Sequence, residues 1–171
     1  MIVESGENLT NADSYVSVEF ADNYFNARAI TEWAELTEEE KEVALIKGTD
    51  FIDTSFDWNG RKATKEQSLN FPRINLRDSN GYEVEGIPLN LMKAVCVASL
   101  NISKGEDMFS VQDANGAIVS ESVGSISTTV YDVSKKEKNV TLYDEINLLL
   151  RGLYVDYTKQ SIKRIKLRRA N

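Results

Sequence analysis

The sequence predicts a mainly α-helical domain: a bundle of four helices with a small β-hairpin and an extended basic C-terminal arm. Three observations lead to this prediction. Four segments repeat apolar residues at helical spacing, and a stretch rich in Val, Ile, Thr and Ser lies before the fourth. Residues 151–171 contain seven Lys and Arg but only one acid, Asp156. We assign the domain to residues 1–157, with the hairpin near residues 109–133, and the arm to residues 158–171.

The first predicted helix covers residues 14–29. Ser17 is a suitable N-cap residue because its hydroxyl can accept a hydrogen bond from an unpaired backbone N–H of the first turn. Its apolar face is expected to contain four residues at helical spacing: Ala21, Tyr24, Phe25 and Ala29.

The second predicted helix begins after Thr37, which forms a capping box with Glu40. Asp50 and Asp53 lie off its apolar stripe, and we expect both carboxylates to face solvent. The core-facing residues of the stripe are Ala44, Leu45, Gly48, Phe51, Ile52 and Phe56.

Residues 57–86 show no long periodicity and contain two turn dipeptides, Asn59-Gly60 and Asn80-Gly81. A loop of this length in a small domain is usually packed against the core. We expect large apolar side chains to hold it there, namely Trp58, Leu69, Phe71, Ile74 and Leu76.

The C-terminal half predicts two more helices with the hairpin between them. Pro88 begins a helix that is apolar on nearly every side and therefore central, and Lys104-Gly105 ends it. Asn115-Gly116 is the expected hairpin turn, and Gly124 is expected to be a bulge or a reversal. The last helix is predicted from Thr141 to about Tyr157.

Composition argues against most enzyme classes. The chain has no histidine and a single cysteine, Cys96, in the middle of the most apolar helix. The commonest general base and the usual zinc ligands are therefore missing. We expect a protein that is not an enzyme and has no cofactor and no metal. We interpret Asp50 and Asp53 as a solvated acidic face. An enzyme that uses these two carboxylates to bind a metal is the weakest alternative. No apolar run suggests a membrane helix, and the N-terminus does not resemble a secretory signal.

Charge is unevenly distributed along the chain. Residues 1–150 hold 13 Lys and Arg against 26 Asp and Glu, a net charge of −13, whereas residues 151–171 carry +6. The arm could dock on an acidic protein surface, contact nucleic-acid phosphates, or serve only for solubility. We favour docking because Ile162, Ile165 and Leu167 are interleaved with the cations.

Two strings resemble a family of tailed-bacteriophage proteins often labelled "DnaT-like single-stranded DNA-binding". They are ADSYVSVEFADNYFNAR at residues 12–28 and WNGRKATKEQSLNFPR at residues 58–73, and the resemblance extends over about residues 1–155. The matching positions are Asp13, Ser14, Tyr15, Ser17, Ala27, Arg28, Trp58, Gly60, Gln67, Leu69, Phe71, Pro72, Arg73, Ile87, Pro88, Met92, Lys93, Ala94 and residues 120–126. For the second string, burial of Trp58 and Phe71 against the core is the simplest structural interpretation.

Members of this family resemble head–tail connector proteins of virions, also called adaptor or head-completion proteins. The resemblance implies a structural virion protein, made in the host cytoplasm, that forms a homo-oligomeric ring, usually a dodecamer, under the portal. Its expected partners are the portal protein and a downstream tail or stopper protein, and packaged DNA would pass through the lumen without specific binding, with no membrane involved. The family label implies an alternative, a single-stranded DNA-binding accessory protein of phage replication.

The acidic body favours the connector hypothesis, because general DNA binding needs Lys and Arg at the surface. We therefore predict that the basic arm docks on the portal after DNA packaging. The predicted partner-binding residues are Arg151, Lys159, Ile162, Lys163, Arg164, Ile165, Lys166, Arg168 and Arg169.

Overall fold

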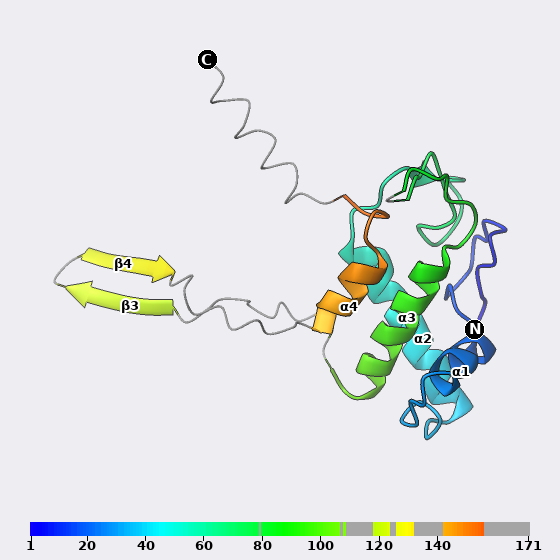
Figure 1. Ribbon diagram of the computed structural model, residues 1–171, viewed down its shortest axis with the longest axis horizontal. Helices are drawn as coiled ribbons and strands as arrows, with labels where there is room; N and C mark the ends of the chain where they lie inside the picture. The colour runs from blue at the N-terminus through cyan, green and yellow to red at the C-terminus, as the bar shows by residue number, and fades with distance from the viewer. Residues whose placement is uncertain (79, 107, 109–117, 124–125, 132–141, 156–171) are drawn as a thin grey trace, which may run out of the picture.

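Helices dominate the chain, as predicted (Figure 1). The computed structural model describes residues 1–78, 80–106, 108, 118–123, 126–131 and 142–155. Within these residues there are four α-helices and two small antiparallel sheets of two strands each. The predicted basic arm, residues 158–171, lies outside the described part of the chain.

Helix α1 extends over Val18–Asn26 and has the predicted cap. The Ser17 hydroxyl accepts a hydrogen bond from the Phe20 backbone N–H at 3.1 Å. The helix ends before Ala29, contrary to the prediction, because Ala29 adopts a left-handed φ of 54° and the Ile30 N–H turns back to the Phe25 carbonyl. Ala29 is therefore exposed and takes no part in the apolar face.

Helix α2 extends over Glu38–Ser55, and its capping box between Thr37 and Glu40 is confirmed. It packs against helix α3, Leu89–Ser103. The two helices approach closely at Gly48, where an added Cβ would lie 2.2 Å from the Ser99 hydroxyl oxygen and 3.1 Å from the Val95 carbonyl oxygen. Glycine at this position therefore allows the two backbones to meet.

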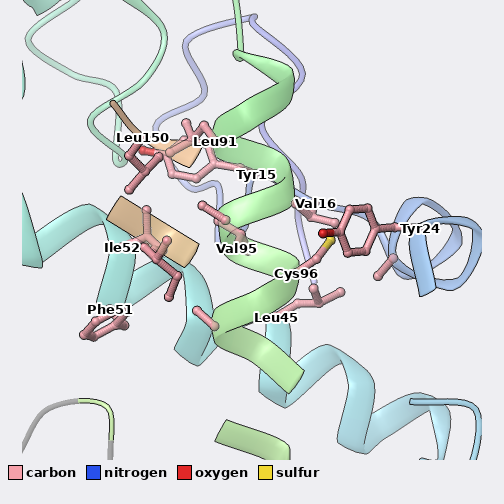
Figure 2. Packing of buried hydrophobic residues seen from close by; sticks show 14 of the residues in the cluster. Tyr15, Val16, Tyr24, Leu45, Phe51, Ile52, Leu91, Val95, Cys96 and Leu150 are labelled. Carbon is pink, nitrogen blue, oxygen red and sulfur yellow. The ribbon is translucent and has the colours of Figure 1, made fainter. Parts of the chain in front are cut away.

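Helix α3 is the central helix, as its apolar circumference predicted. In Figure 2 it runs through the middle of the core, with Phe51 and Ile52 of α2 on one side and Tyr24 of α1 on the other. Only its first turn departs from the prediction, since Leu89 is 54% exposed. The helix ends at Lys104, as expected.

Helix α4, Leu142–Leu149, is shorter than predicted and does not continue to Tyr157. The Leu153 N–H bonds to the Leu150 carbonyl, and Gly152 has a left-handed φ of 92°, so the chain turns out of the helix. It then runs beside Trp58, which forms an isolated antiparallel bridge with Tyr154.

The predicted hairpin is formed by β3, Ile118–Val123, and β4, Ile126–Tyr131. Val123 pairs with Ile126, so the two strands reverse between these residues, which agrees with the reversal offered for Gly124. Ile126, Thr128 and Val130, which were predicted to alternate along a strand, lie in β4. Residues 109–117, where the turn was expected, lie outside the described residues.

No helix in the described part of the chain is both long enough and apolar enough to cross a membrane.

A candidate nucleic-acid interface

The most cationic part of the described chain is an internal loop. Residues 61–77, which we call the cationic loop, hold five Lys and Arg and one acid, Glu66, for a net charge of +4. The 60 residues before it hold 14 acids and three bases, for a net charge of −11. The loop begins with strand β1, Arg61–Lys62, which pairs with strand β2, Arg73–Ile74. It lies at the end of the helices where α2 stops and α3 starts (Figure 1).

The net charge of −13 over residues 1–150 is correct, but it does not describe this segment. Averaging over residues 1–150 concealed the cationic loop, although its sequence contains the signal. A charge window of about 17 residues, the length of this segment, would have found it.

Asp53 of α2 anchors the loop from below. Its carboxylate accepts hydrogen bonds from the Tyr15 hydroxyl and from the Asn70 backbone N–H, the latter at 3.1 Å to each oxygen. The Asn70 side-chain amide donates to the same carboxylate at 3.0 Å. The prediction that Asp53 faces solvent is wrong, because the loop folds across that side of the helix.

Burial raises the pKa of the Asp53 carboxyl, and the hydrogen bonds from Tyr15 and Asn70 oppose part of this rise. Asp50 is exposed and does not join this cluster. Among the described residues, no group of three or more His, Cys, Asp or Glu side chains is placed to hold a metal ion. The two aspartates thus have separate environments, and Asp53 has a structural role.

Two polar side chains of the motif at residues 58–73 make hydrogen bonds inside the loop and hold it together. Gln67 is buried; its amide oxygen accepts from the Thr64 N–H at 2.8 Å, and its amide nitrogen donates to the Pro72 carbonyl at 3.1 Å. Arg73 donates to four backbone carbonyls, those of Asn59 at 2.7 Å, Gly60 at 3.0 Å, Asn70 at 3.1 Å and Trp58 at 3.5 Å. Its guanidinium is therefore engaged within the loop.

Aromatic packing completes this scaffold. The rings of Trp58 and Phe71 meet edge to face at 4.9 Å, and Tyr15 packs on Phe71 at 6.1 Å. The predicted burial of Trp58, Leu69, Phe71 and Leu76 is confirmed. Ile74 differs from the prediction: it is 37% exposed, opposite Arg61 on the paired strands.

The scaffold displays cations that are not engaged within it. Arg61 and Lys65 are exposed, and neither side chain has a hydrogen bond or ion pair with any described residue. Arg77 is also exposed and makes one bond, from its guanidinium to the Gly81 carbonyl at 2.8 Å. None of these three belongs to the motif positions, which instead build the loop that carries them.

An exposed aromatic ring follows the cationic loop. Tyr82 is 72% exposed, on a turn that Asp78 closes by accepting from the Tyr82 N–H at 2.9 Å and the Asn80 N–H at 2.8 Å. The Asp78 N–H also donates to the Tyr82 carbonyl at 2.9 Å. Exposed cations can bind phosphate groups, and an accessible ring can stack on a planar base.

The end of the described chain joins this loop. The Asn59 N–H donates to the Leu153 carbonyl at 2.9 Å, and the Val155 N–H donates to the Asp57 carbonyl at 2.7 Å. Val155, the last residue that the structure describes, therefore lies beside the cationic loop, and six Lys and Arg follow it in the sequence. Of the predicted partner-binding residues, Arg151 is exposed on the turn after α4; Lys159, Ile162, Lys163, Arg164, Ile165, Lys166, Arg168 and Arg169 lie outside the described residues.

The single thiol is not suited to nucleophilic chemistry. Cys96 is fully buried in α3, and burial raises the pKa of its thiol to about 12. The reactive thiolate form is therefore scarce at neutral pH.

A substitution at Gly60 would show whether the stability of the protein depends on close packing within the loop. Its φ is +70°, and an added Cβ would lie 2.7 Å from the Ile74 carbonyl oxygen, a backbone atom that has little freedom to move. Gly81 has a similar φ of +89° but nothing within 4 Å. We expect Gly60→Ala to lower the free energy of unfolding by about 3 kcal/mol, and Gly81→Ala by about 1 kcal/mol, in a urea titration. Equal effects would show that the close approach at Gly60 is unimportant.

Comparison with known proteins gives one family. A family model described as "Putative DnaT-like ssDNA binding protein" matches residues 1–170. Neither the curated proteins nor the solved structures gave a match.

Proposed function

The chain belongs to the DnaT-like family whose model it matches over nearly its full length, and we propose that it is an accessory protein of DNA replication that binds single-stranded DNA. One observation carries the proposal: within residues 1–150, whose net charge is −13, the cationic loop concentrates a net charge of +4. Phosphates are bound mainly by Lys and Arg, so the loop is the part of the described chain best suited to them.

This proposal replaces the connector hypothesis. The family match contradicts the predicted roles as a virion connector, adaptor or head-completion protein, along with the portal, tail and ring partners and the prediction that DNA is not bound specifically. The physical argument for that hypothesis was that the acidic body lacks the surface Lys and Arg that DNA binding needs. The cationic loop removes this argument, because exposed Arg61 and Lys65 would attract passing phosphates.

Single-strand preference would come from Tyr82. Its ring is accessible, and the Asp78 turn holds its backbone in place. In single-stranded DNA each base has an accessible π-face, whereas in a duplex the bases are already stacked on one another. Binding through such a ring depends little on sequence.

The basic arm gives a second source of phosphate contacts. Val155 is held against Asp57 next to the loop, and the cations from Lys159 to Arg169 follow it closely in the sequence. In the proposal the arm and the loop hold the same strand. The mechanism is binding alone, without covalent chemistry, and the buried Cys96 and the anchored Asp53 agree with that.

The proposal is tested with a labelled oligothymidylate of about 20 nucleotides, longer than the ~4–16 nucleotides that one binding fold covers. We expect Tyr82→Ala to weaken its binding by about 1 to 3 kcal/mol, the usual effect of losing one base–aromatic stack. Tyr82→Phe is the matched control, since it keeps the ring, and it should bind like the unmodified protein. If Tyr82→Ala binds as tightly as Tyr82→Phe, the stacking role of Tyr82 is wrong.

A further inference from the structure

An apolar groove lies between α2 and α3, on a part of the protein that the proposed interface does not use. Its volume is about 300 Å³. Leu36, Val43, Ala44 and Ile102 form its apolar lining, and Val43 is 49% exposed. A groove of this size with a half-exposed valine in its lining can accept aliphatic side chains from another segment.

The surroundings of the groove are acidic. Glu39 and Glu40 line it; exposed Glu38 adjoins Glu39 in the sequence, and exposed Glu35 adjoins Leu36. Hydrogen bonding to Thr37 lowers the pKa of Glu40, so its carboxylate stays charged at neutral pH. The groove also includes residues at the C-terminal end of α3, where the helix dipole favours cations. Lys47 is the one cation in the lining.

We propose that this groove binds residues 159–169 of the same chain when DNA is absent. That segment, KQSIKRIKLRR, contains six cations and the aliphatic residues Ile162, Ile165 and Leu167. Its composition matches both properties of the groove: aliphatic side chains for the apolar lining and Lys and Arg for the glutamates. The other cationic segment, the cationic loop, is held in the folded body and cannot move to the groove.

The arm is long enough to reach the groove. Its starting point is fixed, because Val155 is bonded to Asp57 just past the end of α2. Val43 lies 12 residues before Ser55, where α2 ends, and at 1.5 Å per helical residue this is about 18 Å along the helix. From Val155 to Ile165 there are ten residues, which span about 33 Å when extended. The segment can thus run back along α2 with length to spare.

Docking would compete with the proposed function. The cations that contact phosphate in that proposal are the same ones that the glutamates would hold, so the arm would be bound either by the groove or by the strand. The competition therefore rests on the proposed DNA binding, whereas the contact between the arm and the groove does not depend on it.

Disulfide trapping in the full chain tests the contact. The variant Val43→Cys/Ile165→Cys places one thiol in the groove and one in the arm, and the buried Cys96 does not interfere. The matched control is Tyr82→Cys/Ile165→Cys. Its first thiol, at position 82, is well exposed and lies outside the groove, on the segment that follows the cationic loop. Under mild oxidation we expect the groove pair to form an intramolecular disulfide about 10-fold faster than the control, because docking raises the effective concentration of the thiols.

The outcomes are separable by electrophoresis without reductant and peptide mapping. Equal rates for the two pairs would overturn the inference, and so would covalent dimers as the main product, since the occupant would then be a second copy. Added oligothymidylate should slow trapping of the groove pair. If trapping occurs but the unmodified protein does not bind the oligonucleotide, only the proposed function fails; if it binds DNA but the groove pair does not trap, only the docking inference fails.

Discussion

Reversing two charges of the cationic loop, in Arg61→Glu/Lys65→Glu, is expected to weaken binding of single-stranded DNA on the order of 100-fold at about 0.1 M salt. Two phosphate contacts are lost and two like-charge repulsions are gained. Both side chains are exposed and have no partner among the described residues. The fold should therefore be unaffected, with a change in unfolding free energy within about 0.5 kcal/mol.

The matched control is Arg28→Glu/Lys104→Glu. It changes the same residue types and the same total charge, but Arg28 covers the Tyr24 ring near the end of α1, and Lys104 pairs with Glu32 at the end of α3. If the control weakens binding as much as the loop variant, net charge rather than the loop governs affinity, and the proposed interface is wrong.

The second large effect is expected on stability. Asp53→Ala should lower the free energy of unfolding by about 3 kcal/mol or more, because it leaves the Tyr15 hydroxyl and two donors of Asn70 without an acceptor in a part-buried site. Asp50→Ala removes an exposed carboxylate one turn earlier and is the control, with an expected change within about 0.5 kcal/mol. Chemical denaturation followed by tryptophan fluorescence measures both, and similar values for the two variants would contradict the anchoring role.

The raised pKa of Asp53 gives this interaction a defined pH dependence. A raised pKa means that the folded state holds the proton more tightly than the unfolded chain, so the contribution is complete below about pH 3.9 and is lost as pH rises through the folded pKa. The stability difference between the unmodified protein and Asp53→Asn should accordingly widen as pH is lowered towards about 4. A difference that narrows on acidification would mean that the charged carboxylate is the stabilising form.

Local signals predicted most of the helical framework. The Ser17 cap, the Thr37–Glu40 capping box and the stop at Lys104 depend on residues within one turn of each other, and all three are confirmed. The failures at Ala29 and after Leu149 have a common cause. In both places side-chain spacing continues to look helical while the backbone turns into a left-handed conformation, at Ala29 itself and at Gly152.

Long-range packing explains why the site was harder to predict. A helical wheel placed Asp53 opposite the apolar stripe, but it contains no information about Asn70 arriving 17 residues later to cover that side. The motif containing Trp58, Gln67 and Arg73 was correctly interpreted as a packed loop, whereas its purpose as a support for Arg61 and Lys65 emerged only from the contacts. The charge of the loop itself was visible in the sequence and was hidden by averaging.

The central claim, that this chain binds single-stranded DNA electrostatically through the cationic loop, is tested most directly by equilibrium binding of oligothymidylate to the unmodified protein over a range of salt concentrations. Each phosphate contact on a single strand contributes about −0.7 to the slope of log K against log salt. With Arg61, Lys65 and Arg77 engaged, the expected slope is about −2 or steeper, and the competing duplex of equal length should bind more weakly. No binding at about 50 mM salt, or an affinity that does not change with salt, would contradict the account.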